Sequence, residues 1–122
     1  MHTGLAVSSE EKADRFYCDI LGLEKSESRI IDRQIVRTLF GIDHELRMIH
    51  YQGGTVDFEL FIQKGFKAPE KQIAHTCIKI ADLPDIIARC RKAGIRVVEV
   101  TKNSGVITFI SDYDGNLFEL KA

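Results

Sequence analysis

An internal repeat restricts the fold of this chain more than any other feature of its sequence. Residues 2–7 read HTGLAV and residues 75–80 read HTCIKI, so each copy opens with His-Thr and continues in a strand-like alternating pattern. Each copy also closes with a glutamate inside an apolar run, Glu59 in VDFELFI and Glu119 in NLFEL. A duplication on this scale indicates two structural units of the same kind in a chain of 122 residues.

The spacing of matching positions shows where the two copies keep the same register. His2 and His75 lie 73 positions apart, and Gly22 and Gly94 lie 72 apart. The two closing glutamates lie only 60 apart, because the first copy is 12 residues longer between its glycine and its glutamate. The additional length falls in residues 23–54. We expect this unduplicated stretch to encode the choice of substrate.

A helix is predicted after the first strand of each copy. The first helix, residues 9–20, begins at a capping serine and carries apolar side chains at the i, i+3, i+4 spacing of one face. The second helix, residues 83–93, begins at Asp82 and has the same kind of apolar stripe. Gly22 and Gly94 follow the two helices and predict their ends, since glycine readily adopts the left-handed conformation found there.

After each helix the hydrophobic period changes to two, which predicts three further strands per copy. These strands are expected at residues 29–40, 46–52 and 56–62 in the first copy, and at residues 97–100, 106–110 and 117–120 in the second. Each copy is therefore predicted to be a βαβββ module, with hairpin signals at Gly53-Gly54 and Asp114-Gly115. We expect an α+β fold in which the paired modules form a curved mixed sheet around a cup.

This fold predicts a single domain that spans residues 1–122. Module one covers about residues 1–66, and module two covers about residues 73–122. A chain of this length buries enough apolar surface to form one core.

Strand geometry places one histidine and one glutamate of each copy on the open side of the sheet. Successive side chains of a strand alternate between its two faces, and the large apolar residues of each strand face the helix. His2 and Glu59 of the first copy then point away from the helix, as do His75, Cys77 and Glu119 of the second. The two histidines and two glutamates are predicted as four metal ligands in the hollow of the sheet.

Two imidazoles and two carboxylates form a mixed nitrogen and oxygen donor set. This set suits Zn, Ni, Co, Mn or Fe(II), and ligand type alone does not choose among these ions. Four protein ligands leave open positions on an octahedral ion, which can hold two waters or two adjacent oxygens of a substrate. The metal would act there as a Lewis acid and stabilise charge that develops on an enediolate oxygen.

Composition and charge exclude several other classes of function. The chain has 17 basic and 18 acidic residues and no basic stripe, so nucleic acid is not an expected partner. No apolar run reaches the length of a membrane span, and no signal-peptide pattern opens the chain. The three cysteines show no zinc-site spacing and are interpreted as reduced thiols, which favours a cytoplasmic location.

Three runs of the sequence resemble the glyoxalase/vicinal-oxygen-chelate superfamily, namely HTGLAVSSEEKADRFYCDILGLE, IAHTCIKIADL and ITFISDYDGNLFEL. The Asp-x-Asp-Gly-x-x-x-Glu-Leu ending of the third run is typical of that superfamily. The resemblance extends from His2 to Leu120 and is weakest in residues 26–54. It implies paired βαβββ modules, a homodimer, and a divalent metal ion in the shared cup, with Ni or Zn ahead of Mn, Co or Fe. It also assigns the ligand roles to the same two histidines and two glutamates.

A His/Glu/His/Glu ligand set is most similar to bacterial-type glyoxalase I, a lactoylglutathione lyase. The resemblance thus implies a metal-dependent lyase that converts the thiol hemithioacetal of a 2-oxoaldehyde to a 2-hydroxyacyl thioester by proton transfer through an enediolate. By this analogy Glu119 is the base and Glu59 is the other candidate. Relatives that use glutathione usually carry an asparagine soon after the second ligand, whereas LFIQKGFKA follows Glu59 here. Glutathione and another thiol are both open as co-substrate.

Three alternative functions of a small-molecule site are also open. An acyl-CoA epimerase of the methylmalonyl-CoA type would use the same proton chemistry. A metal-free binding or resistance protein would sequester its ligand in the cup, although such relatives usually lose ligands that this chain keeps. An extradiol-type dioxygenase usually presents two histidines and one glutamate, so a glutamate at the second ligand position argues against it.

Further polar residues are candidates for contact with the substrate. Arg33 and Arg37 share a face of the predicted strand and are the arginine pair most suited to a substrate carboxylate or phosphate. Cys77 is expected to line the cup. His44 and His50 have no counterpart in the other copy, and we interpret them as surface or loop residues.

Overall fold

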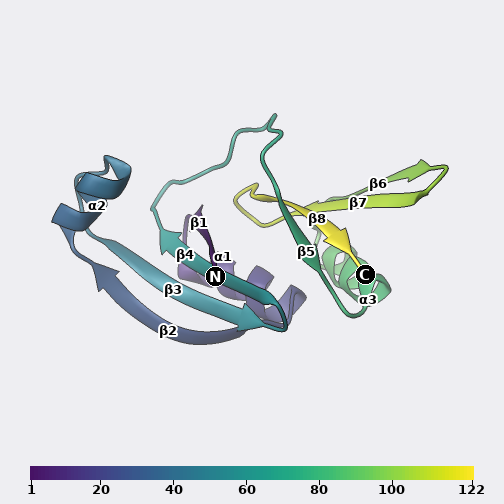
Figure 1. Cartoon of the computed structure of the whole chain (residues 1–122), viewed down its shortest axis with the longest axis horizontal. Helices are drawn as coiled ribbons and strands as arrows, with labels where there is room; N and C mark the ends of the chain where they lie inside the picture. Colours follow the sequence, from purple (N-terminus) through teal and green to yellow (C-terminus); the bar gives the residue numbers. More distant parts are fainter.

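The computed structural model describes all 122 residues and contains the two predicted modules (Figure 1). The first module consists of β1 (Thr3–Val7), α1 (Glu10–Ala13), the π-helical segment η1 (Asp14–Ile20), β2 (Glu24–Ile31), α2 (Arg33–Phe40), β3 (Leu46–Gly53) and β4 (Val56–Ile62). The second consists of β5 (Thr76–Lys79), α3 (Leu83–Lys92), β6 (Val97–Lys102), β7 (Gly105–Ser111) and β8 (Leu117–Lys121). The predicted α+β fold of βαβββ modules is confirmed, with α2 as an additional helix.

Each module has its own four-stranded mixed sheet, and neither sheet closes into a barrel. The strand order is β1-β4-β3-β2 in the first module and β5-β8-β7-β6 in the second. The first strand of each module pairs in parallel with the last, and the other pairs are antiparallel. The register is equivalent in both copies, because Gly4 lies opposite Glu59 and Cys77 lies opposite Glu119. The curved sheet expected from the sequence thus consists of two sheets.

The prediction of one strand over residues 29–40 is wrong in its second half, where the chain forms α2. The side chain of Asp32 caps this helix by accepting a hydrogen bond from the backbone N–H of Gln34 at 2.6 Å. Gly41 ends it in the left-handed conformation, with φ of 71°. Apolar pairs recur every four residues in this segment, which is a helical spacing, and the buried Val36 attaches the helix to the module.

The helix expected over residues 9–20 is present but changes its hydrogen bonding within its length. Ser9 caps α1 by accepting a hydrogen bond from the N–H of Lys12 at 3.2 Å. The following segment, η1, is π-helical, and the N–H of Leu21 donates to the carbonyl of Phe16 at 3.0 Å, five residues back. Two large side chains of η1, Phe16 and Tyr17, are fully buried at the centre of the molecule.

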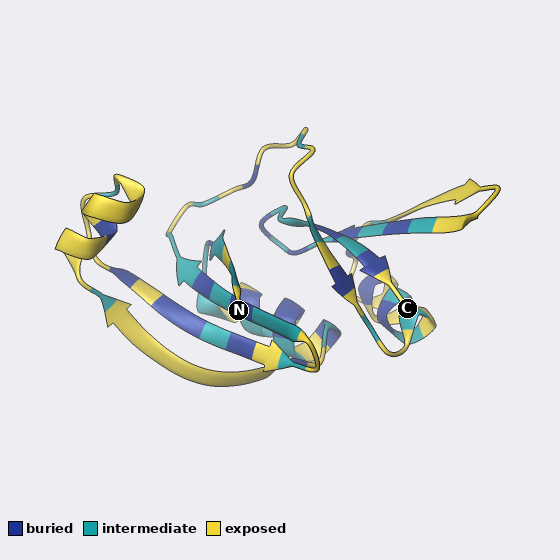
Figure 2. Cartoon of the chain, in the orientation of Figure 1, coloured by how far each residue is buried: buried dark blue, intermediate teal, exposed yellow.

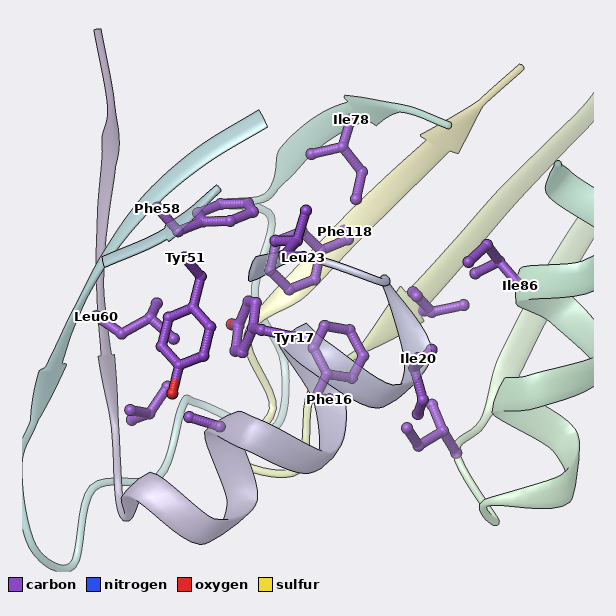
Figure 3. Close-up of a cluster of buried hydrophobic side chains, with 14 of the residues drawn as sticks. Phe16, Tyr17, Ile20, Leu23, Tyr51, Phe58, Leu60, Ile78, Ile86 and Phe118 are labelled. Atoms are coloured by element: carbon purple, nitrogen blue, oxygen red, sulfur yellow. The ribbon is translucent and has the colours of Figure 1, made fainter. Parts of the chain in front are cut away.

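One hydrophobic core joins the two modules (Figure 3). Phe16 and Tyr17 of η1 pack against Phe118 of β8, with ring centroids 5.6 Å and 6.1 Å from the Phe118 ring. The Phe118 ring also meets Phe58 of β4 edge to face at 5.7 Å. All four side chains are at most 1% exposed. Since aromatic burial is a large stabilising contribution, neither module retains its full core without the other.

The Asp-x-Asp-Gly motif forms the turn between β7 and β8 and fastens it to the first module. Oδ2 of Asp112 accepts a hydrogen bond from Tyr17 Oη at 2.7 Å, and Oδ1 accepts from the N–H groups of Asp114 and Asn116 at 2.9 Å each. The carboxylate of Asp114 accepts from both the N–H and the hydroxyl of Ser8, at 2.7 Å and 2.6 Å. Burial raises the pKa of Asp112 and also the pKa of Tyr17.

Two largely exposed regions lie at opposite ends of the molecule, and residues 64–75 between the modules are also mostly exposed. Figure 2 shows β2 and α2 as almost wholly exposed at one end, and the β6–β7 hairpin as largely exposed at the other. None of the helices has the length and apolar character needed to span a membrane. The three cysteines form no disulfide, and burial raises the pKa of the Cys90 thiol to about 11.

Candidate functional site

The first histidine and glutamate of the repeat form a pair on the open face of the first sheet. His2 lies just before β1, and its Nε2 is 3.1 Å from Oε1 of Glu59 on β4. The alternation of β4 buries Phe58 and Leu60 on the helix side, at 1% and 0% exposure, and turns Glu59 to the opposite side. Gly4 is the β1 residue opposite Glu59. We call this pair, His2 and Glu59, the first half-site.

The second histidine and glutamate form the equivalent pair in the second module. Nε2 of His75 lies 3.5 Å from Oε1 of Glu119 on β8. Nδ1 of His75 donates a hydrogen bond to the carbonyl of Ile73 at 2.8 Å, so in the neutral ring Nε2 carries the lone pair. A backbone carbonyl that fixes the tautomer in this way is a common support for metal-binding histidines. We call His75 and Glu119 the second half-site.

The four predicted ligands do not come together within one chain. No group of three or more histidine, cysteine, aspartate or glutamate side chains is placed so that it could share one metal ion. The fold therefore presents two His–Glu half-sites at matching positions, one on each sheet, instead of one four-ligand cup.

The spacing inside each half-site suits two neighbouring ligands of one ion. Metal bonds of about 2.1 Å at right angles place adjacent donor atoms about 3.0 Å apart. The nitrogen-to-oxygen distances of 3.1 Å and 3.5 Å are close to that value. One imidazole and one carboxylate are donors that divalent Zn, Ni, Co, Mn and Fe accept.

A second polar pair, missed from the sequence, lies beside the first half-site. His50 of β3 is opposite Glu59 in register, and its ring centroid is 6.5 Å from that of His2. Nε2 of His50 lies 2.6 Å from Oδ1 of Asp57. The two groups are not oriented to form a hydrogen bond, and both atoms are shielded from solvent. The interpretation of His50 as a surface or loop residue is therefore wrong, since its side chain is only 15% exposed.

The sequence did contain a signal for this placement. The Gly53-Gly54 turn sets the register of the hairpin, and counting back from it places residue 50 opposite residue 59. As expected from the sequence, His50 has no counterpart in the second module. Phe109 occupies the matching position of the second module, opposite Glu119, and its ring lies 4.9 Å from that of His75.

The remaining candidate residues have different surroundings. Arg33 is exposed and forms an ion pair with Asp43, Nε to Oδ1 at 2.8 Å, which lowers the pKa of that carboxyl. Arg37 is exposed on α2. Cys77 lines a cavity of about 250 Å³ together with His2, so these two side chains face the same space from different modules.

A larger cavity, of about 490 Å³, opens directly on the first half-site. His2 and Glu59 are at its polar end, and neither Arg33 nor Arg37 lines it. Its other walls are mainly apolar and come from β1, α2, β3, β4 and the segment after α2, through Leu5, Leu39, Phe40, Ile42, Leu46 and Phe61.

The fold and the paired half-sites can be compared with known proteins. A glyoxalase family protein from Enterococcus faecalis superposes with a TM-score of 0.74 at 22% identity, covering 99% of this chain and 94% of that one. The trypanothione-dependent glyoxalase I of Leishmania major superposes with a TM-score of 0.73 at 20% identity, with coverages of 98% and 83%. A variant of the fosfomycin resistance protein FosX from Listeria monocytogenes, in complex with Mn(II) and 1S,2S-dihydroxypropylphosphonic acid, gives 0.73 at 18%, with coverages of 99% and 86%. At these identities the likeness shows the fold alone.

No curated protein matches the sequence. The family model described as "Glyoxalase/Bleomycin resistance protein/Dioxygenase superfamily" matches residues 1–120. Since this match extends over nearly the whole chain, the chain belongs to the glyoxalase/bleomycin resistance protein/dioxygenase superfamily.

Proposed function

We propose that this protein is a metal-dependent lyase of the glyoxalase I type, which converts the thiol hemithioacetal of a 2-oxoaldehyde to a 2-hydroxyacyl thioester. The observation that carries the proposal is the equivalence of its two half-sites. Each module holds one histidine and one glutamate at the same register position, 3.1 Å and 3.5 Å apart. Superfamily membership and the fold shared with a glyoxalase I support the same reading.

His2, Glu59, His75 and Glu119 are the residues that would hold the ion. Ni or Zn is our first expectation, with Mn, Co or Fe as alternatives; a FosX relative has been solved with Mn(II). When bound, the ion would supply Lewis-acid polarisation of the substrate oxygens. In the neutral ring, the hydrogen bond from His75 to the Ile73 carbonyl selects the tautomer whose Nε2 lone pair faces Glu119.

A complete four-ligand site would form between two copies of the chain. Within one copy the half-sites stay apart, so each needs a partner that supplies the other pair. In a two-fold dimer, module one of one protomer would face module two of the other, and the same contact would occur twice. A homodimer with two such sites gives each half-site the second pair of ligands that it lacks within its own chain.

The carboxylate of Glu119 would move the proton. It would take the proton from the hemithioacetal carbon, which bears the sulfur and the hydroxyl, and return it to the neighbouring carbonyl carbon. The hydroxyl proton would pass to the former carbonyl oxygen. Atoms and charge then balance as an isomerisation. We assign this role to Glu119 ahead of Glu59 by analogy with the superfamily. Its Oε1 lies 3.5 Å from Nε2 of His75, and its Oε2 lies 3.8 Å from Nζ of Lys121.

A panel assay tests the proposal. Protein loaded separately with Ni(II), Zn(II), Mn(II) or Co(II) is offered hemithioacetals of methylglyoxal with glutathione and with other thiols. Methylmalonyl-CoA and fosfomycin are included as substrates of the competing functions. We expect thioester formation from a hemithioacetal with at least one metal. Failure of every hemithioacetal with metal-loaded protein contradicts the proposal, and failure to retain any divalent ion favours a metal-free binding protein.

A further inference from the structure

Helix α2 has an apolar face with no protein partner on its outer side. Leu39 is 67% exposed and Phe40 is 49% exposed, although both side chains are large and apolar. The Phe40 ring contacts the Phe61 ring edge to face at 5.4 Å, which fixes α2 against β4. Phe61 lies two residues after Glu59, so it points to the same side of the strand.

The same two side chains of α2 form a wall of the 490 Å³ cavity that ends at His2 and Glu59. This volume is within the range of small-molecule sites and far exceeds the ~30 Å³ that one water occupies. No arginine, lysine or aspartate lines the cavity, and Glu59 is the sole ionisable carboxylate in it. Gln63 is an uncharged polar side chain in the lining, so a charged group at the α2 end would find no ion-pair partner there, which makes its binding unfavourable.

We infer that this cavity binds an uncharged aliphatic or aromatic substituent of the substrate, and that α2 thereby selects 2-oxoaldehydes with bulky apolar side chains. The inference rests on the proposed function, because the reacting oxygens are placed at His2 and Glu59. A substrate held there directs its side chain along the open face of β1 and β4 toward Phe40. Gly4 also lines the cavity, and a Cβ at that position would make ordinary van der Waals contact with the Phe61 ring at 3.6 Å.

The occupant we assign is a small molecule and not a second copy of the chain. The cavity includes both residues of the first half-site, so whatever fills it also covers the proposed reaction centre. In the proposed dimer a second copy would face only the end of the cavity at His2 and Glu59, and the α2 end would stay available to the substrate.

The test uses hydroxamates, whose two adjacent oxygens chelate a divalent ion and whose alkyl chain can be lengthened. Titration calorimetry with Ni(II)-loaded protein measures the affinity from acetohydroxamate to hexanohydroxamate. Burial of each added methylene predicts a gain of roughly 3- to 4-fold. A hexanohydroxamate with a terminal carboxylate should bind more weakly than the unsubstituted one, because no cationic side chain lines the cavity. An affinity that does not change with chain length overturns the inference.

Variants locate the effect on α2. Leu39→Ala and Phe40→Ala should each reduce the gain per methylene, and so weaken hexanohydroxamate binding more than acetohydroxamate binding. Ile35→Ala is the matched control, since Ile35 is also on α2 and 50% exposed but does not line the cavity. If Leu39→Ala or Phe40→Ala instead shifts the sedimentation coefficient and leaves the chain-length dependence intact, α2 is a contact between copies and the inference is wrong.

A metal-free arm separates this inference from the proposed function. Linear alcohols from propanol to octanol are titrated on metal-free protein and followed by the NMR signals of the Leu39 methyl groups. Tighter binding with chain length, reduced by Phe40→Ala, supports the apolar pocket even if no metal binds. Loss of acetohydroxamate binding alone contradicts the proposed metal site, whereas loss of the chain-length effect in both series contradicts the pocket.

Discussion

Tyr17 donates a hydrogen bond of 2.7 Å to Asp112, and this bond connects the helix of the first module to the signature turn of the second. Both side chains are buried, at 0% and 5% exposure. The neighbouring Asp114 accepts two hydrogen bonds from Ser8, so the turn is bound both to the residues just before α1 and to η1. The hydrogen bonds of the Asp-x-Asp-Gly motif thus hold the two modules together in this fold.

Tyr17→Phe is expected to lower the free energy of unfolding by about 1–3 kcal/mol. The substitution keeps the aromatic packing but leaves Asp112 Oδ2 without the phenol donor in a buried site. Urea denaturation measures the change. Tyr113→Phe serves as the control, since its hydroxyl takes part in none of the hydrogen bonds of the structure. An equal loss in both variants would mean that the Tyr17 bond has no special role.

The raised pKa of Asp112 predicts a pH dependence of stability. Burial makes ionisation of Asp112 less favourable in the folded state than in the unfolded state, where its pKa is about 3.9. Its contribution to stability is therefore fully present below about pH 3.9 and is lost as pH rises through the raised folded-state value. Asn at position 112 does not titrate. The stability of the wild type relative to Asp112→Asn should fall between pH 3 and pH 7, and a rise over that range contradicts the assignment.

The sequence predicted the duplicated parts of the fold because both copies obey the same simple rules. Gly22 and Gly94 end equivalent helices with φ of 73° and 76°, and the alternation around Glu59 and Glu119 buries the apolar neighbours as expected. These features depend on local periodicity and glycine conformation, which the residues themselves carry.

The unduplicated stretch was not predicted correctly, for a physical reason. Ile30, Ile31 and Val36 continue an apolar pattern that fits a strand, but the side chain of Asp32 accepts a hydrogen bond from the N–H of Gln34 and starts a helix. The choice between strand and helix there depends on one capping side chain and on packing against Phe61, which is distant in sequence.

The arrangement of the half-sites also depends on more than local sequence. The alternation of side chains along a strand predicts that the histidine and glutamate of one module share a face of its sheet. It does not predict the angle between the two sheets. That angle is set by the aromatic contacts of Phe16, Tyr17, Phe58 and Phe118 in the shared core. The histidine and glutamate of each module therefore lie close together, and the two pairs lie apart from each other.

His50 and Asp57 should be replaceable by the residues of the second module without loss of stability. Phe109 and Leu117 occupy the matching positions, and the present pair buries a nitrogen and an oxygen that make no hydrogen bond. The free energy of unfolding of the double variant His50→Phe, Asp57→Leu is expected to be within about 1 kcal/mol of the wild-type value, or higher. Urea denaturation measures it.

The single variant Asp57→Leu is the comparison. It leaves the buried His50 nitrogen without its neighbouring carboxylate and should cost about 1–3 kcal/mol in the same denaturation experiment. A double variant that is less stable than this single variant would show that the polar pair stabilises the first sheet.

Glu119→Gln should reduce kcat for the best hemithioacetal about 10²- to 10⁴-fold, the usual effect of removing a general base. Gln keeps the size and a donor oxygen but cannot accept the substrate proton. Metal content is measured in the same samples, because Glu119 is also a proposed ligand. Glu24→Gln, a change on the exposed strand β2, is the control. If Glu59→Gln abolishes turnover and Glu119→Gln does not, the two glutamates exchange roles.

Mixing two inactive variants tests whether the site lies between chains. One variant carries His2→Ala and Glu59→Ala, and the other carries His75→Ala and Glu119→Ala. Because the half-sites do not meet within a chain, a mixed dimer places the intact first half-site of one protomer against the intact second half-site of the other. We expect each variant alone to lose tight metal binding and turnover, and co-refolded mixtures to regain up to about one site per mixed dimer. If both half-sites of one chain formed the site, no mixture would recover either property, because every chain carries a damaged pair.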